Sequence, residues 1–280
     1  SRGRNQGRSR FAFITVYAKL IICETGLLEI EPEIPWTNAE ICASMISVRL
    51  YIGEVCLHMK LDIMGLQFDN VTMDEAAARA EEILAGSRTC YAVTPNAEIA
   101  YEALHDEKLR ALLNDADLVL PDGAGVVLAS KLLKTPLKQK VAGVDFADRL
   151  LSILESTGGG LYLLGSKPGI AELAAQKMCE KHPKLHICGM ADGYFKDEAA
   201  VIAKINAAAP DVLFVCLGAP KQEIFMKEHL NELSVKLMIG LGGTLDSFAG
   251  TVKRAPKWMI RCNLEWLYRL IKEPKRFGRM

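Results

Sequence analysis

Short apolar segments alternate with helical segments between residues 59 and 250, and this alternation constrains the fold more than any other feature of the sequence. The run at residues 211–217 is the most β-like of these segments. Strands that are apolar along their whole length are buried on both faces, which is typical of parallel sheets covered by helices on both sides. The sequence therefore predicts an α/β fold in which a Rossmann-like, mainly parallel sheet with helices on both faces spans residues 59–250.

The individual elements follow from composition and from turn residues. Thr72, with Glu75 three residues later, predicts a capping box at the start of the first helix. Asp69 and Asn70 predict a turn just before it. We expect strands at residues 61–68 (an edge strand or hairpin arm), 89–93, 118–120, 161–164, 185–190, 211–217 and 235–241. We expect helices at residues 73–84, 97–104, 106–114, 125–133, 144–155, 170–181 and 197–208, and a further one that ends near residue 230.

Both ends of the chain depart from this pattern. Residues 1–58 are predicted to be an extension outside the regular domain, either disordered or not native, with Met59 as the natural initiator. A basic start followed by an apolar run at residues 11–23 also resembles a signal peptide, although Lys19 interrupts the run. From residue 251 to residue 280, nine Lys or Arg residues stand against two Glu residues, which predicts a basic helical appendage.

Composition narrows the partners and the compartment. The formal net charge is zero, so bulk charge indicates no nucleic-acid partner. The eight cysteines form no C-x-x-C motif and no paired spacing with histidine. This argues against a disulfide framework or a zinc site and favours a reducing, cytoplasmic compartment.

Four predicted strands end in polar or glycine-rich loops. These are T-P-N at 94–96, P-D-G at 121–123, G-S-K-P-G at 165–169 and G-A-P-K-Q-E at 218–223. Parallel strands place such loops at one edge of the sheet, where open α/β sheets bind their ligands. Glycine and proline after a strand are also common turn residues, so each loop alone is weak evidence. The four together predict a cleft, with Asp122 as its acid.

Two of these loops favour an anionic ligand. G-S-K-P-G opens a helix, so its free N–H groups and the helix dipole favour a phosphate, and Lys167 adds a positive charge. G-A-P-K-Q-E repeats the arrangement, with Lys221 and Gln222 as donors. No G-x-G-x-x-G, Walker A or G-x-S-x-G motif is present, which argues against a dinucleotide site, a P-loop and an α/β-hydrolase.

Other candidates in the sequence are weaker. Asp115 and Asp117 form a D-x-D that resembles a metal motif, but they stand where a helix ends and a strand begins, so we interpret them as scaffold and predict no metal site. None of the five histidines lies in the four loops, so we do not expect a histidine acid–base pair. The C-terminal segment carries a helix after Pro256, with Trp258 and Trp266 among cations. This pattern is typical both of a helix that binds an anionic membrane surface and of one docked on the domain.

Together these blocks resemble the WecG/TagA/CpsF family of bacterial glycosyltransferases, and the TagA type in particular. The resemblance covers residues 61–276 and rests on successive motifs: Y-A-V-T-P-N-A-E, A-D-L-V-L-P-D-G-A-G-V, V-A-G-V-D-F, L-L-G-S-K-P-G, C-L-G-A-P-K-Q-E, G-L-G-G-T-L-D-S-F-A-G and K-R-A-P-K-W-M…L-E-W-L-Y-R-L-I-K-E-P-K-R. It implies an enzyme that moves a sugar from a UDP-sugar to a polyprenyl-diphosphate-linked acceptor. It also implies a peripheral protein on the inner face of the cytoplasmic membrane, bound through the C-terminal basic helix, with a possible homo-oligomer.

The resemblance implies roles for the loop residues. Asp122 is the expected catalytic base, and Thr94 and Asn96 line the same pocket. No cofactor is expected, because cations and helix N-termini can stabilise the UDP leaving group without a metal. The expected substrate-binding residues are Gly123, Asp145, Gly165, Ser166, Lys167, Gly218, Pro220, Lys221, Gln222, Arg254, Arg261 and Arg269.

For the TagA type, the implied reaction is inverting transfer of N-acetylmannosamine (ManNAc) from UDP to the 4-hydroxyl of undecaprenyl-diphosphate-linked N-acetylglucosamine (GlcNAc), in wall teichoic acid biosynthesis. Two alternatives stay open. The same fold can use another UDP-sugar, such as the uronic acid of ManNAc or glucose, for enterobacterial common antigen, capsule or exopolysaccharide. The second alternative is a regulator that binds a nucleotide sugar and has no transfer activity.

Overall fold

A computed structural model of the chain describes residues 59–262 and 264–272; the predicted extension at residues 1–58 lies outside them. The described part begins with an antiparallel hairpin of β1 (Lys60–Ile63) and β2 (Leu66–Asp69). Its turn is Met64-Gly65, where both residues have positive φ and where Gly65 N–H bonds to Asp62. The predicted hairpin arm is confirmed, as is a turn at Asp69 and Asn70, where Val71 N–H donates to the Asp69 carbonyl.

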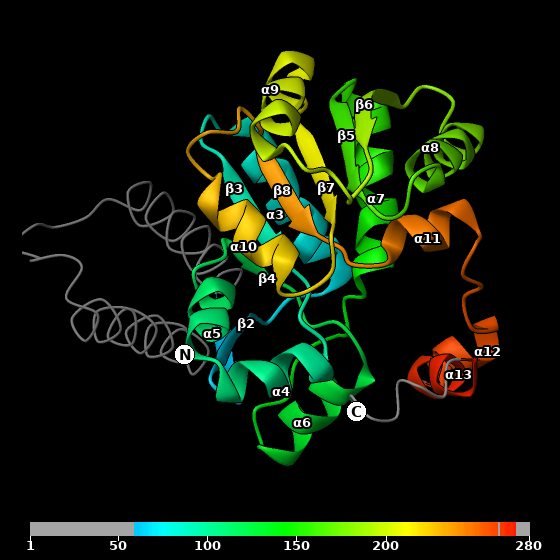
Figure 1. Cartoon of the computed structure of the whole chain (residues 1–280). Helices are drawn as coiled ribbons and strands as arrows, with labels where there is room; N and C mark the ends of the chain where they lie inside the picture. The colour runs from blue at the N-terminus through cyan, green and yellow to red at the C-terminus, as the bar shows by residue number, and fades with distance from the viewer. Residues whose placement is uncertain (1–58, 263, 273–280) are drawn as a thin grey trace, which may run out of the picture. The chain divides into compact units, whose positions relative to one another are not determined.

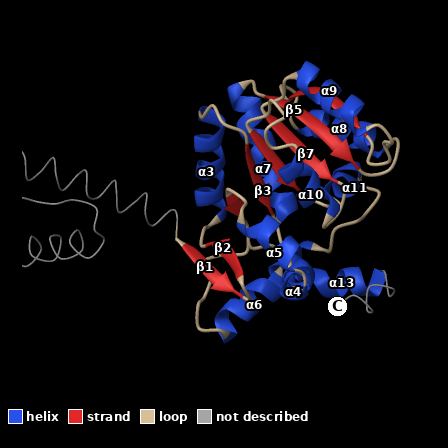
Figure 2. Ribbon diagram, turned by 60° about the vertical axis from the view of Figure 1, so that its left-hand side comes forward, coloured by secondary structure: helices blue, strands red, loops and turns tan. Residues whose placement is uncertain are grey.

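The predicted parallel sheet is confirmed. Six strands lie in the order β4-β3-β8-β7-β5-β6, and each pairing between neighbours is parallel. The strands β3, β5, β7 and β8 are buried along their whole length, because helices cover both faces of the sheet (Figures 1 and 2). The strands are β3 (Cys90–Val93), β4 (Leu118–Val119), β5 (Gly160–Gly165), β6 (His186–Ala191), β7 (Val212–Cys216) and β8 (Leu237–Gly240).

Side chains that alternate along the strands divide the core into two layers. Leu161 and Leu163 of β5 pack with α3, α7, α8 and α11 on one face of the sheet. Tyr162 and Leu164 pack with α4, α5, α6, α9 and α10 on the other. The helices are α3 (Met73–Ala85), α4 (Ala97–His105), α5 (Glu107–Asn114), α6 (Ala124–Leu132), α7 (Gly143–Thr157), α8 (Ile170–Lys181), α9 (Glu198–Ala208), α10 (Lys221–Glu228) and α11 (Thr244–Ala249).

Helix starts follow the chemistry that the sequence predicts. The Thr72 hydroxyl accepts from Glu75 N–H, and the Glu75 carboxylate accepts from Thr72 N–H, so the capping box forms in full. Each bond satisfies a backbone donor that the helix itself leaves unpaired. Asn96 caps α4 by accepting from Ile99 N–H at 3.0 Å.

The C-terminal segment forms two short helices where the sequence predicts one. α12 (Lys257–Arg261) ends where Leu264 N–H bonds back to the Met259 carbonyl, and α13 (Glu265–Lys272) begins at the next residue. Met259 is buried, whereas Trp258 and Trp266 are exposed. In the part of the chain that the structure describes, no helix is both long enough and apolar enough to cross a bilayer.

Candidate active site

The four predicted loops share the carboxyl edge of the sheet, as expected. T-P-N and P-D-G follow the neighbouring strands β3 and β4, and G-S-K-P-G and G-A-P-K-Q-E follow the neighbouring strands β5 and β7. β8 lies between the two pairs, and its own loop, residues 241–243, is a fifth member that sequence reasoning left out. The candidate site therefore has two halves joined across the end of β8.

Thr94 and Asn96 hold one half of the site in shape. The buried Thr94 hydroxyl donates to the Gly240 carbonyl at 2.9 Å, which ties the end of β3 to the end of β8. Gly143, the first residue of α7, packs so closely on Thr94 that a Cβ there would lie 3.1 Å from Thr94 Oγ1. Asn96 uses its Oδ1 for the α4 cap, and its Nδ2 has no hydrogen-bond partner among the described residues. Asn96 can therefore still donate to a substrate oxygen.

Asp122 lies beside Asn96. The P-D-G loop is held by the bond from Val141 N–H to the Pro121 carbonyl. Gly123 has a φ of 86°, which favours glycine, and a Cβ built on it would lie 3.7 Å from Asn96 Cβ. Asp122 itself is half-buried. The P-D-G loop thus packs against Asn96, the residue that caps α4.

Arg254 brings the C-terminal segment to this half of the site. Its Nη1 and Nη2 donate to the two carboxylate oxygens of Asp145, at 2.6 and 3.2 Å, and Glu265 lies 3.9 Å from its Nε. Burial opposes the charge of Arg254, but the hydrogen bonds to Asp145 and the charges of Asp145, Glu265 and Asp122 raise its pKa. Two residues predicted separately for substrate binding, Asp145 and Arg254, are therefore bound to each other, with Asp122 in electrostatic range.

The G-S-K-P-G loop opens α8 as predicted. Gly165 approaches the Cys216 backbone so closely that a Cβ would collide with it. The Ser166 hydroxyl donates to the Asp246 carboxylate at 2.7 Å, so Ser166 is linked to α11, the helix that follows the loop after β8. Lys167 is exposed, and Gly169 precedes the first turn of α8. The loop therefore presents an exposed cation and a helix N-terminus at the sheet edge.

The G-A-P-K-Q-E loop divides its polar side chains between the surface and the interior. Lys221 Nζ lies 3.5 Å from the Gly193 carbonyl and 5.2 Å from the centre of the Phe195 ring. Gln222 is buried: its Oε1 accepts from Gly242 N–H at 2.9 Å, and its Nε2 donates to Glu223 at 2.9 Å. Gln222 therefore connects two strand-end loops. Gly218, with a φ of 79°, and Pro220 shape the turn, and their carbonyls accept from the first turn of α10.

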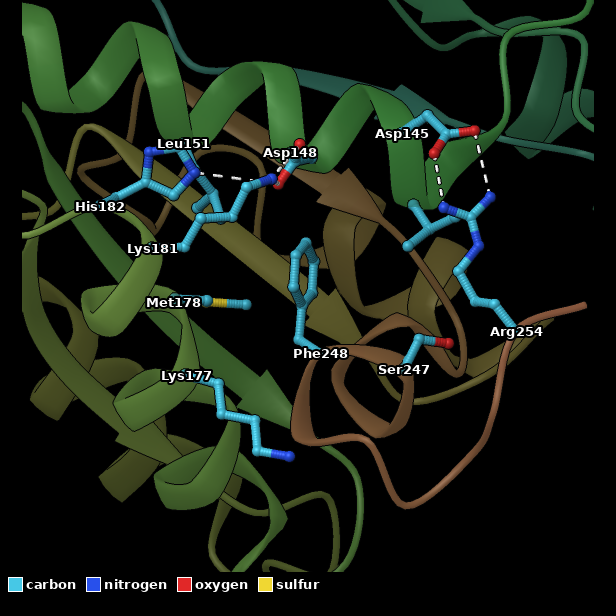
Figure 3. A pocket seen from close by; sticks show the side chains of 11 residues that line it. Asp145, Asp148, Leu151, Lys177, Met178, Lys181, His182, Ser247, Phe248 and Arg254 are labelled. Atoms are coloured by element: carbon cyan, nitrogen blue, oxygen red, sulfur yellow. Dashed lines mark hydrogen bonds and ion pairs between the residues drawn. The ribbon is translucent and has the colours of Figure 1, made fainter. Parts of the chain in front are cut away.

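A cavity of about 300 Å³ lies behind the Asp145–Arg254 pair, between α7, α8 and α11 (Figure 3). Phe248 stands in its middle, and the Lys181–Asp148 ion pair and His182 stand at the far end from Arg254. Asp145 and Arg254 line this cavity and are the two members of its lining that the sequence predicts as substrate-binding residues. Arg261 is exposed on α12, and Arg269 belongs to α13, with its side chain outside the described part.

Comparison with known proteins now decides the family. The family model described as "Glycosyl transferase WecG/TagA/CpsF family" matches residues 61–280. This chain belongs to the WecG/TagA/CpsF glycosyl transferase family. The resemblance seen in the sequence is thus confirmed, and so is the prediction of a glycosyltransferase.

Several relatives carry one name, N-acetylglucosaminyldiphosphoundecaprenol N-acetyl-beta-D-mannosaminyltransferase. The protein of Bacillus spizizenii is 39% identical over 194 residues, which cover 69% of this chain and 76% of the relative. The protein of Bacillus subtilis is 41% identical over 187 residues, 67% of this chain and 73% of the relative. The protein of Staphylococcus aureus strain MRSA252 is 35% identical over 224 residues, 79% of this chain and 88% of the relative.

Both aspartates of the D-x-D make contacts within the domain, which supports their interpretation as scaffold. Asp115 follows the last turn of α5 and pairs with Lys227 at 3.2 Å. Asp117 accepts from Tyr91 N–H at 3.0 Å and from Arg88 at 2.6 Å. Among the described residues, no group of three or more His, Cys, Asp or Glu side chains could hold a metal ion. Metal independence stays a prediction.

Sequence reasoning missed two acids of this glycosyltransferase. Asp246 holds Ser166, and the signal for it was the G-G-T turn at the end of β8, which resembles the other four loops. Glu223 is only 1% exposed, and its Oε2 has no hydrogen-bond partner in the described structure. In the sequence, Glu223 is one polar residue after another polar residue, Gln222. Its neighbours in the sequence do not indicate that its side chain is buried.

We expect the Glu223→Gln variant to lose a pH dependence of stability. Burial raises the pKa of the Glu223 carboxyl, outweighing the hydrogen bond from Gln222 that lowers it. A carboxyl whose pKa is higher in the folded state stabilises the fold below its unfolded pKa, and this stability is lost as pH rises through the folded pKa. Urea unfolding is measured at several pH values from 4.5 upward. As the pH rises, the free energy of unfolding of the variant should increase relative to that of the wild type. The exposed Glu228→Gln on the same helix is the control, and parallel profiles for wild type and Glu223→Gln would refute the burial effect.

Proposed function

We propose that this chain transfers ManNAc from UDP-ManNAc to the 4-hydroxyl of undecaprenyl-diphosphate-linked GlcNAc, with inversion, in wall teichoic acid biosynthesis. One observation carries the proposal: relatives at 35% to 41% identity, matched over two thirds or more of both chains, are all named for that sugar and that lipid-linked acceptor. Their name specifies a beta product. A beta product from an α-linked nucleotide sugar requires inversion at the anomeric carbon.

Asp122 serves as the general base in this proposal. Inverting transfer needs a carboxylate that removes the acceptor's hydroxyl proton as the oxygen attacks the anomeric carbon. Asp122 supports this role because it stands at the carboxyl edge of the sheet beside Asn96, whose Nδ2 can orient the sugar. Thr94 ties the end of β3 to β8 through the Gly240 carbonyl, and in this proposal it positions Asn96 two residues later.

The departing UDP needs positive charge as the glycosidic bond breaks. The exposed Lys167 and the N-terminus of α8 can bind the diphosphate, and Lys221 adds a second cation from the neighbouring loop. Arg254 can join them only by exchanging its bidentate bond to Asp145 for a phosphate. The proposal also assigns Arg261 and Arg269 to the diphosphate and requires no metal.

The C-terminal segment is the proposed membrane contact. Its exposed Trp258, Trp266 and Ile271 and its excess of basic residues suit an anionic lipid surface. The enzyme would act as a peripheral protein on the inner face of the cytoplasmic membrane, where a polyprenyl acceptor is held. Residues 59–250 form the catalytic domain and residues 251–280 the membrane-proximal appendage in this proposal, which also allows a homo-oligomer.

A donor panel tests the substrate assignment. The full chain is incubated with a short-chain lipid-diphosphate-GlcNAc acceptor and, in separate reactions, with UDP-ManNAc, UDP-GlcNAc, UDP-glucose and the uronic acid of UDP-ManNAc. Mass spectrometry of the lipid product should show transfer with UDP-ManNAc at a rate at least about tenfold above each other donor, because a missing sugar contact costs more than 1.4 kcal/mol. Preference for another donor would overturn the ManNAc assignment, and binding without transfer would favour a non-catalytic protein.

A further inference from the structure

Helix α6 is apolar on two faces, and only one of them is covered. Val126 and Ser130 point into the core, whereas Leu128 and Leu132, on the same side four residues apart, are 59% and 75% exposed. Leu133, just after the helix, is 52% exposed. A helix that is apolar all round is ordinarily buried, so an open leucine face of this kind marks a surface that binds something.

Lysines surround this leucine face. The segment from residue 123 to residue 144 contains four lysines and no acidic residue. Lys138 pairs with Glu75 at 2.8 Å, but Lys131 and Lys134 are exposed and form no ion pair with a described residue. Exposed leucines flanked by unpaired lysines fit an anionic lipid surface, because leucine enters the acyl boundary while lysine meets the phosphates.

We propose that α6, with Leu133 and Lys134, is a membrane-binding surface of the folded domain, separate from the C-terminal segment. Leu128, Leu132 and Leu133 enter the headgroup region, and Lys131 and Lys134 contact anionic lipid phosphates. A second copy of this chain is the less suitable occupant, since lysine is depleted in the apolar centre of protein interfaces. The assignment deepens the proposed function, on which it rests for the lipid-linked acceptor.

The position of α6 gives this contact a consequence for catalysis. α6 begins at Ala124, two residues after Asp122, and is about 13 Å long at 1.5 Å per residue. A membrane contact along α6 therefore holds the P-D-G loop close to the bilayer surface, where a lipid-linked diphosphate lies. In Figures 1 and 2, α6 and α13 lie toward the same end of the described domain, so both can meet one surface. Two weak contacts on one surface reinforce each other.

Vesicle binding by the full chain tests the proposal. Sedimentation is measured with phosphatidylglycerol–phosphatidylcholine vesicles and with pure phosphatidylcholine vesicles. The Lys131→Glu/Lys134→Glu variant should bind the anionic vesicles at least about 25-fold more weakly, at roughly fivefold per lysine. Leu128→Ser/Leu132→Ser should weaken binding about tenfold or more through lost apolar burial. Lys196→Glu/Lys204→Glu makes the same charge change at two exposed lysines, one before and one within α9. This control should weaken binding less than threefold, because charges more than a Debye length from the membrane surface are largely screened.

Two further measurements keep the outcomes distinct. All the altered side chains are exposed, so each variant should fold. Thermal unfolding of each variant checks this. Analytical ultracentrifugation gives the mass of each variant: if the leucine variant turns a dimer into a monomer while vesicle binding stays unchanged, the face is a contact between copies and the membrane proposal is wrong. Unchanged vesicle binding in both variants would overturn it as well. Vesicle binding is read without any sugar donor, so failure of the proposed transfer reaction would appear separately, as a wild-type chain that binds vesicles but forms no product.

Discussion

The Asp122→Asn variant is expected to transfer sugar about 10²–10⁴ times more slowly than the wild type, because an amide cannot accept the proton of the acceptor hydroxyl. Asparagine keeps the size of the side chain, so affinity for the UDP-sugar should change by less than about threefold, well below 1.4 kcal/mol. Single-turnover rates with the short-chain acceptor, together with calorimetric titration of the nucleotide sugar, measure both quantities.

The matched control for this variant is Asp115→Asn. Asp115 belongs to the D-x-D, is exposed and pairs with Lys227 at the surface, so its loss should leave turnover near the wild-type rate. If Asp122→Asn turns over at a near wild-type rate, Asp122 is not the base. If Asp115→Asn is the inactive variant, the D-x-D has a catalytic role that its contacts do not indicate.

Deleting the residues after Gly250 is expected to lower the rate of sugar transfer by about 10²-fold or more. A loss of this size is typical when an enzyme loses a group that stabilises charge developing in the transition state. The deletion removes Arg254 and the other cations of the segment, and with them the exposed Trp258 and Trp266 that suit lipid. Vesicle binding should fall about tenfold or more, with the remainder due to α6. Turnover, vesicle sedimentation and thermal unfolding are measured on the truncated and the full chain.

The core of the truncated chain should stay folded. Among the described residues, neither layer of the hydrophobic core includes a side chain beyond Ala249. The deletion therefore costs the burial of Ala255 and Met259 and the Asp145–Arg254 pair, but no sheet contact. Arg254→Ala alone separates the two roles: it should lower transfer while vesicle binding stays. Unchanged vesicle binding after truncation would refute the membrane role of the segment.

Local chemistry explains why most of the fold could be predicted from the sequence. The capping box of Thr72 and Glu75 depends on residues three apart, and the buried strands are visible as short apolar runs. The parallel order then brings the four strand-end loops to one edge without further information. The sequence did not predict that the C-terminal segment forms two short helices. The break between them depends on a backbone hydrogen bond between Leu264 and Met259, which the pattern of side chains does not indicate.

The details of the candidate site depend on contacts between distant parts of the chain. Asp145 and Arg254 are 109 residues apart, and Thr94 and Gly240 are 146 apart, so the sequence names these residues without showing that they pair. The same holds for Ser166 with Asp246. Sequence reasoning therefore identifies which residues gather at the sheet edge, but not which of them bind each other before a substrate arrives. In the structure, Thr94 and Gln222 hydrogen-bond to other strand ends and loops, whereas Lys167 and Asn96 can still bind a substrate.

The most direct test of the central claim is the linkage of the product formed by the wild-type chain. The full chain is incubated with UDP-ManNAc and the lipid-diphosphate-GlcNAc acceptor, and the released UDP and the lipid product are quantified, the latter with NMR assignment of its new glycosidic bond. We predict one UDP released for each ManNAc added, in β linkage to the 4-hydroxyl of GlcNAc. Release of UDP without a lipid product, or an α-linked product, would contradict inverting transfer by Asp122.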